Sequence, residues 1–483
     1  MFNLKQFFMQ KKNLFGIALL CASVFLFTGC KEIMSHFDNS VDSHLTMNTS
    51  DVALFVGQKA SYPATTLSDE KIEFKSSNNE VVTVDQQGNI EAVGAGTATI
   101  SAFVKDNGLW AEGKVSYNVV VEEFDLTKQY DLAFEKASGD VVEIVIPADV
   151  KAIMTDKIKT TAGKKLVVKS ADKNAPATIT TKGLSEKNMF EINSSLVLQD
   201  LKIDASELVK KSMITTGTLP GTSKTNNDLY FSAEYAAKVL ANEGKVVTKM
   251  DADAFILDEI TVENCMIRGV NMNLVFNGST VWAVEELNVK NNIIQLDDEL
   301  YTFIRLHAVK NLNIIGNTIF NLKETGTKPG STDKGDTYIF RQSNASNAAK
   351  YYGINNKPND NASLKWVVQD NTFIRTFTGK DFANNVTNNK AVTITLKNNV
   401  LYDVYRFNKI VGGNMIKDFD KTTNFIYGDK VTIDNTDKGT YCTLLTSAPF
   451  EIPTEALDLT KKNGGLNLKA AGAAGAGDPR WRD

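Results

Sequence analysis

Arginine is scarce in this chain, and its placement gives the first indication of chemistry. Only seven arginines occur, and two of them lie in the last four residues. The other five are Arg268, Arg305, Arg341, Arg375 and Arg406. A guanidinium group offers a planar fork of donors that matches a carboxylate with two parallel hydrogen bonds, and it stacks on aromatic rings. These five residues therefore predict a face that binds acidic sugars.

The residues around Arg305 extend this prediction. Along a strand, successive side chains point to opposite sides. Arg305 and His307 alternate with Ile304 and Leu306. We therefore expect them to project from one strand surface, together with Tyr301 and Phe303. The alternative interpretation is that each arginine is an isolated surface cation whose stem covers an apolar strand.

An acidic triplet precedes this strand. Asp297, Asp298 and Glu299 supply the carboxylate oxygens that Ca²⁺ prefers, which makes them a candidate calcium site. The alternative is a solvated turn, since runs of like charge usually face water. With only His36, His44 and His307 in the chain, a histidine-rich metal site is excluded.

A repeated pattern predicts the elements that position these side chains. An alternating apolar segment, an Asn and a second apolar segment recur around Asn264, Asn292, Asn317, Asn371 and Asn399, with steps of 28, 25, 54 and 28 residues. Such self-similarity indicates a solenoid, and the alternation indicates strands. The step of 54 is either two periods or one period with an insertion. Arg268 and Arg375 each follow a repeated Asn by four residues, so we expect them to share one corner or face.

A repeat this short buries its apolar face only by stacking on its neighbours, about 4.8 Å apart, which predicts a right-handed parallel β-helix. Asn tolerates left-handed backbone and forms local hydrogen bonds, so the repeated Asn residues should stack as a ladder along one corner. The alternative is a β-sandwich with Asn-rich turns, which would show turn signals every 8–12 residues.

The N-terminus is typical of an export signal. Lysines precede an apolar stretch over 14–27, and Phe27-Thr28-Gly29-Cys30 resembles a bacterial lipobox. The resemblance implies that residues 1–29 are a signal peptide and that Cys30 is lipidated, anchoring the protein in a membrane. The alternative is an ordinary secretory signal with a chance Cys. Removing residues 1–29 takes away three lysines and no acid, which changes the net charge from −4 to −7. An acidic chain argues against nucleic acid as a partner.

Two further segments complete the N-terminal half. Residues 30–44 are polar and aperiodic, as expected of a tether. Residues 45–122 contain short strands separated by turns, and the stretches 74–78, 82–93 and 96–100 resemble the bacterial Ig-like group 2 domain. That resemblance implies a small β-sandwich acting as a spacer or adhesive module, here a stalk. Of the remaining cysteines, Cys265 lies within a repeat and is expected to be a buried thiol.

The expected all-β chain continues with the β-helix over 123–465 and a Gly/Ala-rich tail over 466–483 that ends in Gly-Asp-Pro-Arg-Trp. The segments near 206–250 and 323–364 are expected to be excursions from the solenoid, where binding faces often form. The Asn turns, the preceding sandwich, the lipobox and this ending resemble a group of Bacteroidetes outer-membrane lipoproteins with pectate-lyase-like β-helices. The resemblance implies a setting in polysaccharide utilisation, together with other outer-membrane glycan-uptake proteins.

Three functions fit these features. The first is a surface lipoprotein that binds a polysaccharide, possibly an acidic, pectin-like one. The second is a calcium-dependent lyase in which Arg305 would be the base and the acidic triplet would hold the cation. Two Arg flanking a Pro, as in pectate lyases, and the paired-Asp and His-Gly signatures of β-helical glycoside hydrolases are absent. The third is an adhesive or structural surface protein without a glycan site.

Overall fold

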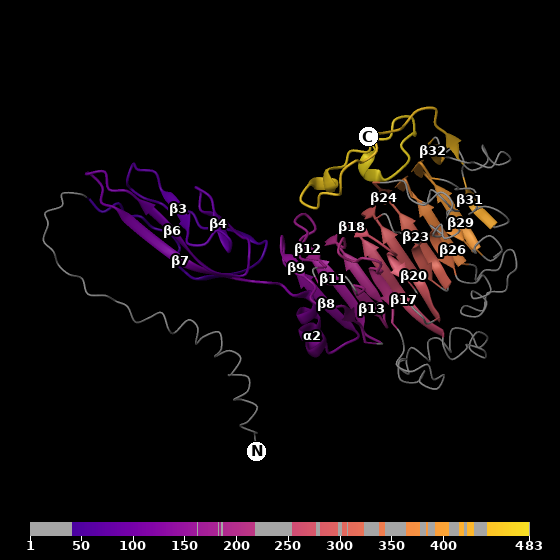
Figure 1. The fold of residues 1–483 in the computed structure, drawn as a ribbon, viewed down its shortest axis with the longest axis horizontal. Coiled ribbons are helices and arrows are strands. Elements are labelled where there is room, and N and C mark those ends of the chain that lie inside the picture. The colour runs from indigo at the N-terminus through magenta and orange to yellow at the C-terminus, as the bar shows by residue number, and fades with distance from the viewer. Residues whose placement is uncertain are drawn as a thin grey trace, which may run out of the picture.

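The structure is a computed structural model (Figure 1). It describes residues 41–161, 163–181, 183–184, 187–217, 254–276, 281–297, 302–306, 308–322, 338–342, 364–376, 383–384, 392–404, 415–419, 423–428 and 442–482. The predicted signal peptide, Cys30 and most of the predicted tether lie outside these residues. Within them, no helix has the length and apolar character needed to cross a bilayer.

The first domain is a β-sandwich. One sheet has the order β1-β7-β6-β3, and the other has the order β2-β5-β4. The strands are β1 (Val52–Phe55), β2 (Lys59–Ser61), β3 (Glu73–Ser76), β4 (Val82–Val84), β5 (Asn89–Ala92), β6 (Gly96–Val104) and β7 (Gly113–Glu122). The alternating pattern buries Ile100 and Val119 between the sheets and leaves the intervening side chains outside. The Asp85–Gly88 turn closes a hairpin, with Gly88 at φ 83°.

The sandwich contacts the first coil of the solenoid directly. The rings of Phe55 and Phe124 lie edge to face, with centroids 5.2 Å apart. The carbonyl of Val56 accepts a hydrogen bond of 2.7 Å from the backbone N–H of Lys151. Gly57 has φ 95°, and a Cβ atom there would lie 2.4 Å from the carbonyl oxygen of Asp149. Backbone thus meets backbone at this junction, which requires glycine.

Three parallel sheets form the solenoid. The nine-strand sheet contains β8 (Val141–Ile146), β11 (Lys165–Ser170), β14 (Leu196–Gln199), β17 (Ala254–Glu263), β20 (Val281–Lys290), β23 (Ala308–Ile315), β26 (Leu364–Gln369), β29 (Val392–Lys397) and β31 (Met415–Phe419). The ten-strand sheet contains β9 (Lys151–Ile153), β12 (Thr178–Thr180), β15 (Lys202–Asp204), β18 (Met266–Val270), β21 (Ile293–Leu296), β24 (Thr318–Asn321), β27 (Thr372–Ile374), β30 (Val400–Tyr402), β32 (Phe425–Tyr427) and β33 (Thr443–Leu444). The seven-strand sheet contains β10 (Ile158–Lys159), β13 (Phe190–Ile192), β16 (Ile214–Thr216), β19 (Val275–Phe276), β22 (Thr302–Leu306), β25 (Tyr338–Gln342) and β28 (Ala383–Asn384).

The chain visits these sheets in rotation, and each strand pairs in parallel with the strand one coil later. A column of apolar side chains shows the register inside the nine-strand sheet. It runs through Leu166, Leu196, Ile260, Leu287, Leu312, Trp366 and Ile394. All of these side chains are buried, so the coils share one continuous core. This confirms the predicted parallel β-helix behind an Ig-like domain.

One helix precedes the first coil, and the sequence analysis missed it. Helix α2 (Leu126–Lys136) begins after Asp125, whose carboxylate accepts a hydrogen bond of 3.0 Å from the N–H of Thr127. Leu126 and Tyr130 are buried on the helix face that packs on the solenoid core. An Asp directly before an apolar residue is an N-cap signal, so this helix was open to prediction. The sequence also has a helix-like stretch over 232–243, within the predicted excursion near 206–250, and it lies outside the described residues.

The Asn ladder is present, but each corner uses two adjacent residues where the sequence predicted one. The first has left-handed backbone, and the second forms the ladder. The buried rungs are Cys265, Asn292, Asn317, Asn371, Asn399 and Asn424. In each of the first five rungs the backbone N–H donates to the side-chain oxygen of the next rung at 2.8–3.1 Å, over steps of 27, 25, 54, 28 and 25 residues. The residue before each of the first five rungs has left-handed backbone: Asn264, Asn291, Gly316, Asp370 and Asn398. Asn264 therefore belongs to the left-handed set, and its alignment with Asn292 was wrong by one residue.

The step of 54 is also resolved. Strands β23 and β24 pair directly with β26 and β27, so a single coil with an insertion separates them.

At the Cys265 rung the buried thiol confirms the prediction for that residue. Burial raises the pKa of the Cys265 thiol to about 12, so the group stays protonated at neutral pH.

The C-terminal segment covers the outer surface of the ten-strand sheet (Figure 1, yellow). Leu457, Leu468 and Trp481 pack against outward-facing side chains that include Phe320 and Ile374. These strands are therefore buried on both sides, which explains why β24 and β27 contain no exposed residue. Residues 466–483, predicted only as a Gly/Ala-rich tail, thus pack on the solenoid, which their sequence alone did not indicate.

Candidate functional site

A column of outward positions on the seven-strand sheet brings two of the five arginines together. Strand pairing places Phe276, Arg305 and Arg341 at the same position of β19, β22 and β25. Neighbouring strands lie about 4.8 Å apart, so this column places Arg305 between an aromatic ring and a second arginine position. The guanidinium carbon of Arg305 lies 5.5 Å from the centroid of the Phe276 ring. This distance is within the range of a cation–π contact.

The same column combines charges of both signs in the N-terminal coils. Lys159, Glu191 and Thr215 occupy the equivalent positions of β10, β13 and β16. Burial alone would raise the pKa of Glu191, but the ammonium groups of Lys157 and Lys159 together lower it. Glu191 is thus a paired carboxylate, and its charge is compensated locally. The arginines of the column, Arg305 and Arg341, lie farther along it.

Not every residue predicted for this face lies on it. Phe303 is fully buried in the solenoid core, so the prediction that it lines a glycan-binding face is wrong. Strict alternation failed here because both Phe303 and its neighbour Ile304 face the core. Tyr301, His307 and Arg406 lie outside the described residues, as does the side chain of Arg341. Phe276 was missed, because nothing in its local sequence distinguishes an outward aromatic residue from a core one.

Arg268 lies on a different sheet. It is in β18 of the ten-strand sheet, where it pairs with Asp204 one coil earlier. Its Nε lies 3.2 Å from Oδ1, and its terminal nitrogen contacts Oδ2. Burial raises the pKa of Asp204, but hydrogen bonds from Arg268 and Ser206 outweigh burial and hold it below the usual value. The arginine fork is therefore engaged by a carboxylate of the protein itself.

Arg268→Met is expected to destabilise the solenoid by about 1–2 kcal/mol at pH 7, because Asp204 then lacks its charged partner. A carboxylate with a lowered folded pKa contributes stability above its unfolded pKa of about 3.9, and this contribution is lost as the pH falls through the folded pKa. The difference between wild type and variant should therefore shrink from pH 5 to about pH 3. Urea unfolding at a series of pH values measures it. Lys187→Met, which opens the exposed pair with Asp156, is the control and should have a smaller effect. A difference that stays constant with pH would contradict this assignment.

Arg375 lies at a corner, one position later than Arg268 in the coil. Strand pairing aligns Arg268 with Asp204, whereas Arg375 follows the end of β27 with φ 50°. Its guanidinium donates to the carbonyl of Leu322 at 2.7 Å and lies 3.9 Å from Asp403. Arg268 and Arg375 thus lie within and at the end of strands of the same ten-strand sheet, but they occupy positions that differ by one, because the predicted alignment used Asn264.

The acidic triplet is described only at Asp297. The backbone N–H of Asp297 donates to the carbonyl of Val270 at 2.9 Å, and its carboxylate lies 3.5 Å from the amide nitrogen of Asn271. Asp298 and Glu299 lie outside the described residues, so the candidate calcium site stays a prediction. In the described part of the chain, no group of three or more His, Cys, Asp or Glu side chains is placed to hold a metal ion.

The long connections of the chain adjoin the seven-strand sheet. Residues 218–253 follow β16, residues 323–337 precede β25, and residues 343–363 follow it. Each of these segments therefore begins or ends at a strand of the sheet that carries Arg305. Binding residues concentrate on connections that a rigid scaffold holds in place. The same sheet thus combines the arginine column with the chain segments that vary most in length.

Comparisons with known proteins identify the N-terminal domain. No curated protein matches the chain at a significant level. Among solved structures, a bacterial Ig-like domain containing GH10 xylanase from termite gut is similar at 11% sequence identity with a TM-score of 0.14; the match covers 44% of this chain and half of that one. The family model for the bacterial Ig-like domain (group 2) matches residues 56–115. Residues 56–115 therefore form a bacterial Ig-like domain of group 2.

Proposed function

We propose that this protein binds an acidic polysaccharide on the outer face of the seven-strand sheet. The observation that carries the proposal is the column of Phe276, Arg305 and Arg341 on successive coils. A guanidinium presents a planar fork of donors that matches a uronate carboxylate with two parallel hydrogen bonds, and the neighbouring aromatic ring suits the apolar face of a sugar. Repetition of the coils favours a ligand that itself repeats, as a polysaccharide does.

The proposed setting is an outer-membrane surface. The lipobox-like Phe27-Thr28-Gly29-Cys30 supports export and lipidation at Cys30. The Ig-like domain would then hold the solenoid away from the membrane. The direct backbone contact between Val56 and Lys151 supports a stalk that positions the solenoid. In this setting, other outer-membrane glycan-uptake proteins would be the partners that receive the bound polysaccharide.

Arg305→Ala is expected to weaken the binding of oligogalacturonate by at least about tenfold, because a hydrogen bond to a charged group contributes about 1.5–3 kcal/mol and a factor of ten corresponds to about 1.4 kcal/mol. Arg305→Ala with Arg341→Ala should remove binding at this face. Isothermal titration of the full chain measures both. Lys365→Ala is the matched control, because it removes one exposed cation from the nine-strand sheet of the same solenoid. Equal affinities in all variants would sink the proposal.

The same samples separate binding from catalysis. If Arg305 is the base of a calcium-dependent lyase, incubation with polygalacturonate and Ca²⁺ should produce absorbance from unsaturated products, and Arg305→Ala should abolish it. Binding without such products supports the proposed binding protein. Absence of both binding and products would favour the adhesive or structural alternative.

A further inference from the structure

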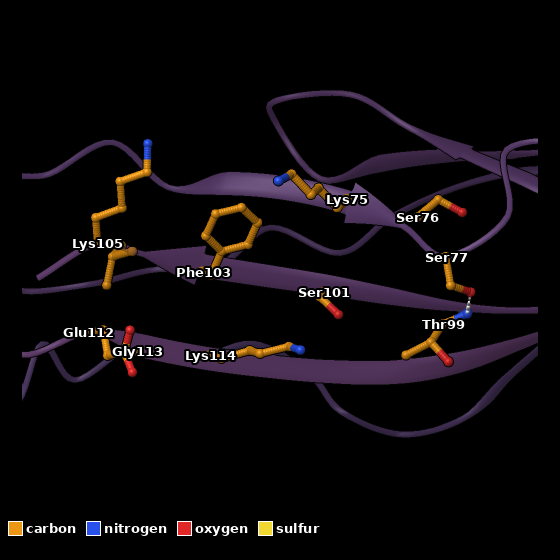
Figure 2. A pocket seen from close by; sticks show the side chains of 11 residues that line it. Lys75, Ser76, Ser77, Thr99, Ser101, Phe103, Lys105, Glu112, Gly113 and Lys114 are labelled. Carbon is orange, nitrogen blue, oxygen red and sulfur yellow. Dashed lines mark hydrogen bonds between the residues drawn. The ribbon is translucent and has the colours of Figure 1, made fainter.

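The outer face of the Ig-like domain contains a cationic cleft of about 530 Å³ (Figure 2). It lies on the sheet formed by β3, β6 and β7. Its lining includes Lys75, Lys105, Lys114 and Phe103, together with the hydroxyl groups of Ser101 and Thr99. The expectation of a passive stalk did not include any site on this domain.

The strand register explains why these side chains meet. In β6, Ala102 and Val104 point into the sandwich, which leaves Ser101 and Phe103 on the outside. Phe103 lies opposite Glu73 of β3 and Lys114 of β7, and Ser101 lies opposite Lys75. Figure 2 shows the Phe103 ring in the middle of this face, between the lysines of β3 and β7.

The lysine ammonium groups of the cleft lie around the Phe103 ring. The ammonium group of Lys75 lies 4.8 Å from the centroid of Phe103. Lys105 forms an ion pair of 3.0 Å with Glu73, and its side chain is 71% exposed. Glu73 thereby compensates one of the three lysines, and Glu112 is the one acid in the lining. The cleft keeps an excess of positive charge beside a partly exposed aromatic ring.

This charge is exceptional within the domain. Residues 45–122 contain ten acidic residues, five lysines and no arginine, which gives a net charge of 5 − 10 = −5. Three of the five lysines nevertheless line this one cleft. Such local concentration against an acidic background focuses a positive potential on the cleft and favours an anionic ligand there.

We propose that this cleft is a separate binding site for an anionic saccharide. The Phe103 ring offers a flat apolar surface to one face of a sugar ring, and the serine and threonine hydroxyls can exchange hydrogen bonds with sugar hydroxyls. Lys75 and Lys114 supply point charges for a carboxylate or a sulfate ester. The site goes beyond the proposed function of the solenoid and does not depend on it. If both sites bind one chain, the second contact becomes intramolecular and raises the overall affinity.

Residue-specific lysine labelling of the full chain tests this site. Oligogalacturonate, dextran sulfate and neutral dextran are added before brief reaction with an amine-directed reagent, and labelling is measured by mass spectrometry. We expect an anionic saccharide to protect Lys75 and Lys114 and to leave Lys59, which lies on the other sheet of the sandwich, unchanged. Protection by oligogalacturonate assigns carboxylates as the ligand groups, and protection by dextran sulfate alone assigns sulfate esters. Phe103→Ala should weaken the affinity read at Lys75 by about tenfold.

The outcomes separate this site from the solenoid face. Protection of Lys75 and Lys114 should persist in the Arg305→Ala, Arg341→Ala double variant, because the two sites use different residues. Protection that disappears in that variant would overturn the claim of a separate site. Equal protection by neutral dextran, or no protection by any saccharide, would also overturn the proposal, while leaving the binding measured at the solenoid unaffected.

Discussion

Asn317→Ala is expected to lower the free energy of unfolding of the solenoid by about 3–5 kcal/mol, because several buried polar groups then lose their partners at about 1–3 kcal/mol each. The side-chain oxygen of Asn317 accepts hydrogen bonds of 2.9 and 3.0 Å from the backbone and side chain of Asn292. Its amide group donates to the carbonyl of Val289 at 2.8 Å and to the side chain of Asn371 at 3.0 Å. Asn317 is completely buried, so water cannot replace these bonds.

Asn313→Ala is the matched control for this prediction. Asn313 is on the same coil and donates to the side chain of Asn288 at 2.9 Å, but it lies on the half-exposed outer face of the nine-strand sheet. Water can satisfy the groups that it leaves, so the expected loss is below about 1 kcal/mol. Urea unfolding monitored by circular dichroism compares the two variants. Similar losses of unfolding free energy in the two variants would contradict the claim that burial makes the hydrogen bonds of the ladder important for stability.

The second large effect is expected at the C-terminal clasp, the segment 477–482 that fastens the chain end to the ten-strand sheet. Asp478 is buried; its carboxylate accepts a hydrogen bond of 2.7 Å from the hydroxyl of Thr318 and one of 3.0 Å from Nε of Arg480. Arg480 in turn donates to the backbone carbonyls of Asn291 and Asn292 at 2.7 and 2.6 Å. The clasp therefore binds backbone carbonyls at the corner of the solenoid where the Asn ladder lies.

Asp478→Ala is expected to weaken docking of the clasp by about 3–5 kcal/mol, because it leaves the Arg480 cation without its buried partner. About 1.4 kcal/mol is a factor of ten, so local opening of residues 477–482 should rise by more than about a hundredfold. Hydrogen–deuterium exchange of the C-terminal peptide measures this opening.

Asp458→Ala changes an acid of the same C-terminal segment that is exposed to solvent and pairs with Lys461 at 3.2 Å. It should leave exchange of residues 477–482 unchanged. Rapid exchange in both variants, or in neither, would contradict the role assigned to Asp478.

The solenoid could be predicted because its signal is periodic and local. Alternating apolar residues and a turn Asn recur from coil to coil. Because each coil must bury its apolar face, the coils stack into a solenoid. The alignment failed by one residue at Asn264 because two adjacent corner positions both favour Asn, one for left-handed backbone and one for the ladder. Pairs such as Asn291–Asn292 and Asn398–Asn399 conceal this division, and only the hydrogen bonds separate the two roles.

The site was less predictable because it depends on register between distant segments. Arg305 and Arg341 are separated by a long insertion, and no local pattern states that they occupy one column. Phe303 was misplaced because strict alternation fails in this short strand. Packing of Trp481 on Thr318 could not be predicted either, since it joins residues 163 positions apart through side chains alone.

The central claim is that guanidinium groups on the seven-strand sheet recognise carboxylates of a polysaccharide. Arginine-directed labelling of the full chain tests it at the residues themselves, in the presence of oligogalacturonate or of its fully methyl-esterified form. We expect the acid form to protect Arg305 and Arg341 and the neutral ester to leave both unprotected, whereas Arg268, engaged by Asp204, should show no change with either. Equal protection by acid and ester, or unchanged labelling of Arg305 at saturating acid, would contradict it.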